Sequence, residues 1–259
     1  MLHSKHLLIF VLALIFNACS NSTKIKNDLL FQTSTFDALL AGNYEGVINF
    51  KELSKKGNFG IGTFNELDGE MIALDGTFYQ IKSDGQVYPV KLEMKTPFAV
   101  VTNFIADTSF QLYSKLTYNQ LNEFVDQLIP SKNIFYAIKV EGKFERVVTR
   151  SVPKQAKPYP DLIEVVKEQP LFEFNSQNGV MVGFRVPEFM EGINVPAYHY
   201  HFMNKEKNKG GHLLECILSD VKISIDCIHK TQIDLPKTNE FHQLNLLKDR
   251  SKESEMVER

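Results

Sequence analysis

Short alternating runs of apolar and polar residues dominate the chain and predict a protein rich in β-strands. Between residues 58 and 85, such runs are separated by Asp68-Gly69, Asp75-Gly76 and Asp84-Gly85. Asp-Gly pairs favour the tight turns that connect antiparallel neighbours, so this stretch is predicted to be an antiparallel meander. The alternation predicts further strands at residues 134–140, 144–152 and over most of 172–228.

Helical periodicity is confined to short segments. An apolar stripe with i, i+3, i+4, i+7 spacing predicts an amphipathic helix at residues 118–128, and Pro130 ends it. A second helix is expected at residues 161–168, between prolines. Many strands and few helices together indicate an α+β fold, sheet-rich, with two mixed or antiparallel β-sheet halves. The stripe of the first helix consists of Leu121, Phe124, Val125 and Leu128.

The N-terminus has the pattern of an export signal. Lys5 is followed by an uninterrupted apolar run, residues 7–16, which would span about 15 Å as a helix, roughly half of a bilayer core. This length is typical of a signal peptide and too short for a membrane span. The run ends at Asn17-Ala18-Cys19, which resembles the lipobox of bacterial lipoproteins and implies cleavage before Cys19 and acylation of that residue. A plain secretory signal with an incidental cysteine is the alternative.

These features predict the organisation of the chain. Residues 1–18 are expected to be the signal peptide, residues 19–28 a lipidated tether, and residues 29–259 one domain. Two similar halves within that domain, with a boundary near residues 145–170, are an alternative prediction. The protein is predicted to be exported, facing the periplasm or the cell exterior, and to touch the membrane only through a lipid anchor at Cys19.

The composition excludes one class of partner. Of the 259 residues, 43% are hydrophobic and 23% are charged, which is the balance of an ordinary globular protein. The formal net charge is -2, so no basic surface for a nucleic-acid backbone is expected.

Two cysteines remain besides Cys19. Cys216 and Cys227 both lie in strand-like runs. They form either one disulfide across a hairpin or two buried thiols, and the sequence leaves both open because it does not give the Cα separation.

Three histidines have the spacing of a metal site. His199 and His201 are two residues apart on a predicted strand, so their side chains share a face. A polar segment with Gly210-Gly211 follows, and it is expected to reverse the chain and return His212 beside them. Three imidazoles on one side of a hairpin are the ligand set of a catalytic zinc site with an open position. A surface His-x-His without function is the alternative.

Two charged residues are candidates for chemistry. Glu70 follows a turn and begins an apolar strand, which would direct its carboxylate into a cleft or into solvent. Arg150 shares a strand face with Val148 and Val152, so partial burial is expected. A buried arginine needs an anionic partner, either a substrate carboxylate or a structural acid.

Several motifs, all in order from about Leu29 to the C-terminus, resemble those of the bacterial alpha-acetolactate decarboxylases. Their combination is specific. The motifs are Gly60-Ile61-Gly62-Thr63-Phe64-Asn65-Glu66-Leu67-Asp68-Gly69-Glu70, Asp75-Gly76, Tyr79-Gln80, Thr96-Pro97-Phe98-Ala99, Arg150, Gln155, Pro158-Tyr159-Pro160, Tyr198-His199-Tyr200-His201-Phe202 and Gly210-Gly211-His212.

The resemblance implies a zinc enzyme that acts as a homodimer and converts (S)-2-acetolactate to (R)-acetoin and carbon dioxide. It implies zinc bound by His199, His201 and His212. In this family the metal acts as a Lewis acid for the enediolate that forms when carbon dioxide leaves, and a stereospecific protonation follows.

The resemblance also implies roles for residues outside the histidine motif. Glu70 and Arg150 match the family's active-site acid and arginine, and Thr63 matches a substrate-binding position. A glutamate of the C-terminal tail is implied as well. Glu258 is assigned to it, with Glu253 and Glu255 nearby. Arg150 would orient the substrate carboxylate, and Glu70 or Glu258 would deliver the proton.

Three other functions use the same residues. An exported zinc hydrolase would need the histidines but no carboxylate-binding arginine. A non-catalytic metal-binding lipoprotein would need neither Glu70 nor Arg150. A non-enzymatic domain of similar fold, found beside AT-hook DNA-binding segments, is disfavoured by the export signal and by the net charge of -2.

Overall fold

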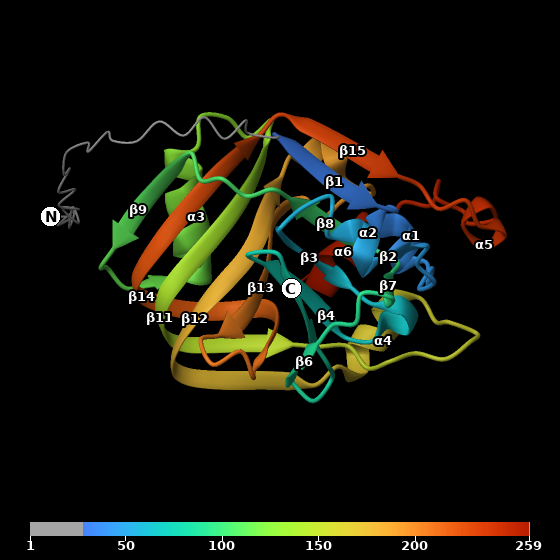
Figure 1. The fold of residues 1–259 in the computed structure, drawn as a ribbon, viewed down its shortest axis with the longest axis horizontal. Helices are drawn as coiled ribbons and strands as arrows, with labels where there is room; N and C mark the ends of the chain where they lie inside the picture. The colour runs from blue at the N-terminus through green and yellow to red at the C-terminus, as the bar shows by residue number, and fades with distance from the viewer. Residues whose placement is uncertain (1–27, 259) are drawn as a thin grey trace, which may run out of the picture.

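The structure is a computed structural model that describes residues 28–258, in which the predicted meander is part of the first sheet, toward one edge (Figure 1). Its strands pair in the order β15-β1-β8-β3-β4-β5-β6. All neighbours are antiparallel except β1 and β15, so the sheet is mixed. The strands are β1 (Leu29–Thr33), β3 (Phe59–Thr63), β4 (Glu70–Leu74), β5 (Thr77–Ile81), β6 (Val87–Pro89), β8 (Ala99–Thr102) and β15 (Lys230–Asp234); β2 (Ile48–Asn49) and β7 (Lys95–Thr96) pair separately.

The second sheet is built from longer strands. β14 pairs with β11, β11 with β12, β12 with β13, and β13 again with β14, so these four strands pair in a closed cycle. β9 and β10 add to the free edge of β14. The strands are β9 (Thr108–Leu112), β10 (Leu116–Thr117), β11 (Phe135–Arg150), β12 (Leu171–Val186), β13 (Ala197–Asn204) and β14 (Gly210–Ile228).

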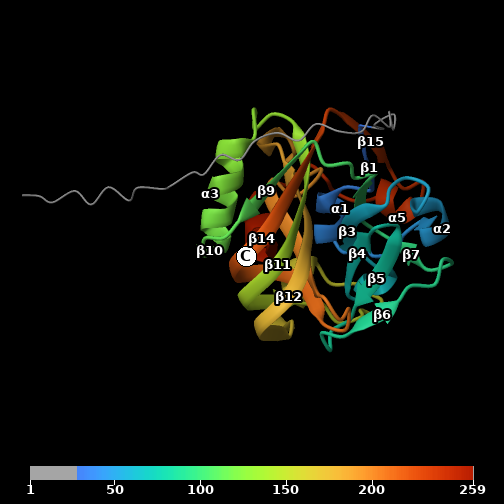
Figure 2. The same ribbon diagram turned by 60° about the vertical axis from the view of Figure 1, so that its left-hand side comes forward.

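The main core lies between the two sheets. Strand alternation directs Ile61 and Ile72 of the first sheet toward Val182 and Phe184 of the second, and all four are buried. Figure 2 shows the resulting layers, with α3 on the outer face of the second sheet and α2 on the outer face of the first. The predicted sheet-rich α+β fold is confirmed.

The helices are few and mostly short. α3 has the predicted bounds. Leu121 and Val125 of its apolar stripe are buried, and the helix ends because the residue before Pro130 is extended. The second predicted helix is present as α4 followed by η2. The helices are α1 (Phe36–Leu40), α2 (Phe50–Leu53), α3 (Tyr118–Leu128), α4 (Leu162–Val165), α5 (Asn239–His242) and α6 (Ser251–Glu258), with 3-10 turns η1 (Asn65–Leu67), η2 (Val166–Glu168) and η3 (Glu188–Met190). None of these helices is long and apolar enough to cross a membrane.

Three expectations differ from the structure or fall outside it. The predicted strands at 134–140 and 144–152 are one strand, β11, which continues through Gly142. Cys216 and Cys227 are not across a hairpin from each other, because both lie on β14, and they form no disulfide. The predicted signal peptide and Cys19 lie outside the described residues.

Candidate metal centre and active site

Strand alternation on β13 sorts its side chains into two sets. Tyr200 and Phe202 join the apolar cluster beneath α3, whereas His199 and His201 face a cavity on the opposite side. The chain then reverses, and the register of β14 places His212 directly opposite His201, as the sequence predicted. Gly211 is required at this turn: its φ is +149°, and a Cβ there would lie 2.4 Å from the Arg150 carbonyl oxygen.

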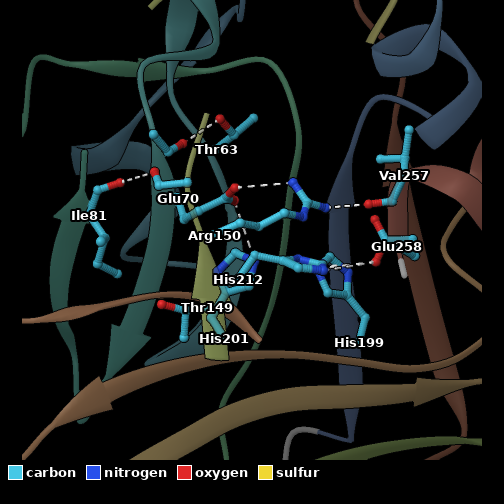
Figure 3. A network of polar contacts seen from close by, with 12 residues as sticks. Thr63, Glu70, Ile81, Thr149, Arg150, His199, His201, His212, Val257 and Glu258 are labelled. Carbon is cyan, nitrogen blue, oxygen red and sulfur yellow. Dashed lines mark hydrogen bonds and ion pairs between the residues drawn. The ribbon is translucent and has the colours of Figure 1, made fainter. Parts of the chain in front are cut away.

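The three imidazoles converge on one point (Figure 3). Their ring centroids are 4.8 to 5.4 Å apart. One ring nitrogen from each histidine lies within 4.8 Å of the others, so a small rotation of the rings brings all three within reach of one ion. All three side chains are buried.

Hydrogen bonding and burial leave these rings ready to bind a cation. His201 Nδ1 lies 2.9 Å from the Met71 carbonyl oxygen, which only accepts, so Nδ1 carries the proton and Nε2 has a free lone pair. The Nε2 atoms of His201 and His212 are buried without a hydrogen-bond partner. Burial lowers the pKa of each ring, to about 3 for His201, and the Arg150 guanidinium acts in the same direction. His199 Nε2 lies 3.1 Å from His212 Nδ1. Neutral imidazoles, two of them with an unpaired Nε2, fit a divalent metal.

Glu70 and Arg150 lie beside the histidines. Glu70 begins β4, and its carboxylate lies 3.5 Å from His201 Nε2 and 3.8 Å from Arg150 Nη1. Burial raises the pKa of Glu70 to about 7, although Arg150 opposes the shift. Arg150 ends β11 and is 3% exposed. Thr63 faces Glu70 across β3 and β4, and its hydroxyl donates to the Gly69 carbonyl at 2.7 Å.

The C-terminal helix α6 completes the cluster. Glu258 Oε2 lies 3.6 Å from His199 Nε2 and 3.9 Å from His212 Nε2. Burial raises the pKa of Glu258 to about 8, with Arg150 lowering it and Glu70 raising it further. Of the three C-terminal glutamates considered, Glu258 is the one in the cavity. Glu255 is exposed, and Glu253 pairs with Arg250 and Lys248.

These side chains line a small cavity of about 40 Å³, about three times the roughly 10–15 Å³ that one water molecule needs. Apolar side chains complete the lining, so a small molecule in this cavity would meet both charged groups and hydrocarbon. The apolar lining consists of Phe36, Leu39, Leu67, Phe98, Val152, Leu162 and Val257.

Most of this apolar lining was not predicted from the sequence. Phe36 and Leu39 have the spacing of a helix face, but that pattern indicates burial and does not show which cavity the face lines. The ion pair between Arg250 and Asp161 at the start of α6 was not predicted either, because it joins segments far apart in the chain.

The chain matches a known family over most of its length. The profile of the alpha-acetolactate decarboxylases matches residues 30–248. The chain belongs to the alpha-acetolactate decarboxylase family. This confirms the resemblance and the prediction that the protein is an enzyme. The match ends before α6, so the placement of Glu258 comes from the structure alone.

Individual relatives match over similar lengths. The alpha-acetolactate decarboxylase of Methanosarcina mazei is 45% identical over 233 residues, 90% of this chain and 81% of the relative. A solved alpha-acetolactate decarboxylase from Bacillus subtilis superimposes with a TM-score of 0.87 at 39% identity and covers 89% of this chain and 99% of its own. A Staphylococcus aureus protein of unknown function, described as similar to alpha-acetolactate decarboxylase, superimposes with a TM-score of 0.83 at 33% identity, covering 88% and 98%.

Proposed function

We propose that the chain decarboxylates (S)-2-acetolactate to (R)-acetoin and carbon dioxide, with a zinc ion held by His199, His201 and His212. The observation that carries this proposal is the convergence of three neutral, buried imidazoles on a cavity that also contains a guanidinium and two carboxyl groups. When bound, the ion would supply a Lewis acid for the negative charge that develops at the ketone oxygen as carbon dioxide leaves.

Arg150 would hold the substrate carboxylate. Its Nη2 donates to the Val257 carbonyl at 2.5 Å, which fixes the direction of the guanidinium. Its Nε is buried without a hydrogen-bond partner, so one donor remains for a ligand. A charge-assisted hydrogen bond from this donor would orient the scissile carboxylate away from the histidines.

The reaction consumes one proton, and the two glutamates provide for it. A carboxylic acid that retains its proton near neutral pH is a suitable donor. The pKa values of Glu258 and Glu70, about 8 and about 7, meet that condition. Both carboxyl groups line the cavity, so either can hold the proton that the reaction consumes. Protonation from one side of the cavity would then set the configuration of acetoin.

The experiment is an acetoin assay on protein purified without residues 1–18. We expect acetoin from acetolactate, loss of the activity after treatment with a chelator, and recovery when zinc is added. Failure to form acetoin would reject the decarboxylase activity. Full activity in protein shown by metal analysis to be free of zinc would reject the metal dependence alone. Ester and amide substrates are tested in parallel, and their hydrolysis would support the alternative function, a zinc hydrolase.

We further propose that the protein is exported, anchored through Cys19 and dimeric. The apolar run at residues 7–16 and the small residue before Cys19 support the anchor. We expect the wild-type chain in the membrane fraction and Cys19→Ser in the soluble fraction. Equal distribution of the two would reject lipidation, and a monomer mass in light scattering would reject the dimer.

A further inference from the structure

The helix that carries Glu258 has little apolar contact to hold it in place. Within α6, only Ser254 and Val257 are buried, and Met256 is 64% exposed. The helix has eight residues, and isolated helices shorter than about 12–15 residues are marginal in water. Burial of one valine side chain contributes roughly 1.5–3 kcal/mol, so other contacts must fix the helix against the cavity.

An ion-pair cluster at the start of α6 provides such contacts. The guanidinium of Arg250 is 7% exposed, and its Nη1 lies 3.2 Å from Asp161 Oδ2 and in contact with the Glu253 carboxylate. The Arg250 carbonyl accepts from Ser254 N at 2.8 Å, which closes the first turn of the helix. Asp161 directly precedes α4, and α4 packs on α6. Arg250 therefore ties the first turn of α6 to the segment on which the helix rests.

The surroundings of Arg250 are acidic. Besides Asp161 and Glu253, the carboxylates of Asp37 on α1 and of Asp249 are nearby: Asp37 interacts electrostatically with Arg250, Glu253 and Asp249. Burial raises the pKa of Asp37; Arg250 opposes this shift, and Glu191, Glu253 and Asp249 add to it. Without the guanidinium, acidic groups on α1, α6 and the segment before α4 would face one another and repel. Lys248 also pairs with Glu253, so loss of Arg250 would loosen α6 chiefly by removing the attraction to Asp161.

The far end of the same helix makes the contacts that the reaction needs. At about 1.5 Å per residue, α6 spans roughly 12 Å from the ion pairs to the cavity. There the Val257 carbonyl fixes Arg150, and Glu258 reaches His199 and His212. A displaced first turn would move both groups together.

We propose that Arg250 and Asp161 are positioning residues, whose ion pair holds α6 against α4 so that Val257 and Glu258 reach the cavity. This inference rests on the proposed decarboxylation. Neither residue touches the histidines, so zinc content is expected to stay the same when either is changed. A displacement of about 1 Å costs up to roughly 100-fold in turnover, so we expect Arg250→Ala to lower kcat by about 10- to 100-fold, with a smaller change in KM.

The test is a double-mutant cycle with Glu258. Arg250→Ala, Glu258→Gln and the double variant are compared by kcat for acetoin formation. If Arg250 acts through α6, Arg250→Ala costs less once Glu258 is replaced, because only its effect through Val257 and Arg150 then remains. The same fold-loss in both backgrounds would overturn the proposal, as would wild-type kcat in Arg250→Ala. Arg250→Lys, which keeps the charge, is expected to recover most of the activity.

Arg146→Ala is the matched control. Arg146 also pairs with two carboxylates, Glu173 and Glu215, but lies on the outer part of the second sheet, so its loss is expected to leave kcat unchanged. A second measurement separates this inference from the proposed function. Amide hydrogen exchange in α6 should be faster in Arg250→Ala and in Asp161→Asn, with α3 unchanged. Unchanged exchange would overturn the proposal even if the wild-type protein formed no acetoin.

Discussion

At the scale of single residues, one hydrogen bond sets the state of the histidine cluster. The Met71 carbonyl fixes the proton of His201 on Nδ1, so Nε2 faces the other two rings with its lone pair. Such a bond to the second nitrogen orients a metal-binding imidazole and makes it a better donor to the ion. The bond also joins β13 to β4, so the ligand geometry depends on the packing of one sheet against the other.

Replacement of His201 by alanine should therefore remove both metal and activity. The variant loses one of three neutral nitrogen ligands and the contact with Met71. We expect loss of stoichiometric zinc, measured by metal analysis, and loss of acetoin formation. His242→Ala, at an exposed position, should retain both. Stoichiometric zinc in His201→Ala would defeat the ligand assignment.

Glu70→Gln should separate metal binding from turnover. The amide is close in shape to the carboxylate but holds no transferable acidic proton and does not pair with Arg150. We expect normal zinc content and a loss of kcat of about 10²- to 10⁴-fold. Glu66→Gln is the control, because Glu66 is only partly buried and pairs with Lys154. Near-normal acetoin production by Glu70→Gln would remove this residue from the mechanism.

The raised pKa of Glu258 predicts how the stability of the metal-free chain depends on pH. The pKa of this carboxyl rises from 4.5, the ordinary value of a solvated glutamate, to about 8 in the folded chain. A raised pKa means that folding favours the protonated form, so the stability is fully present below pH 4.5 and is lost as the pH rises through 8. Each pKa unit corresponds to about 1.4 kcal/mol, so the loss is on the order of a few kcal/mol.

We therefore expect Glu258→Gln to stabilise the metal-free protein at pH 8 and to change it little at pH 4.5. Denaturant midpoints in the presence of a chelator, at both pH values, measure the difference. Glu255→Gln, an exposed position on the same helix, should show no such difference. A Glu258→Gln variant with the pH profile of the wild type would show that Glu258 is solvated in the free protein.

At the scale of elements, the sequence predicts what depends on neighbours in the chain. The bounds of α3 and the Asp-Gly meander follow from local periodicity and turn residues, and the hairpin that pairs His201 with His212 follows from strand alternation. Gly142 was misleading, because glycine between charged residues is typical of a turn, whereas here β11 continues through it. The docking of α6 could not be predicted from neighbours in the chain, because Arg250, at its start, contacts Asp161, which is 89 residues away in the sequence.

α3 offers a test of local stability apart from the cavity. The Thr117 side chain accepts from Gln120 N, and the Gln120 side chain accepts from Thr117 N, so each caps the helix start. We expect Thr117→Ala to lower the free energy of unfolding by about 1 kcal/mol and to leave kcat unchanged, because α3 lies on the outer face of the second sheet. Asn119→Ala, in the same turn and exposed, should not destabilise. Urea denaturation measures both, and a loss of kcat in Thr117→Ala would show that α3 influences the cavity.

At the scale of the whole molecule, the histidine cluster lies where three parts of the fold meet. His201 and His212 come from the second sheet, Glu70 and the Met71 carbonyl from the first, and Glu258 from α6. These parts are assembled only in the folded chain, so an ion bound there binds the folded state and not the unfolded state. Metal binding must then stabilise the entire fold.

The size of this effect follows from mass action. When free zinc greatly exceeds the dissociation constant, each tenfold increase in free zinc adds about 1.4 kcal/mol to the free energy of unfolding. We expect the unfolding midpoint of the wild-type protein to rise steadily with buffered free zinc and to fall when a chelator is added. His201→Ala should lose this dependence while it still unfolds cooperatively. If the unfolding midpoint does not change with zinc in protein that contains stoichiometric metal, the ion lies outside the cluster, because an ion bound by the histidines that β13 and β14 bring together in the folded chain cannot leave the folding equilibrium unchanged.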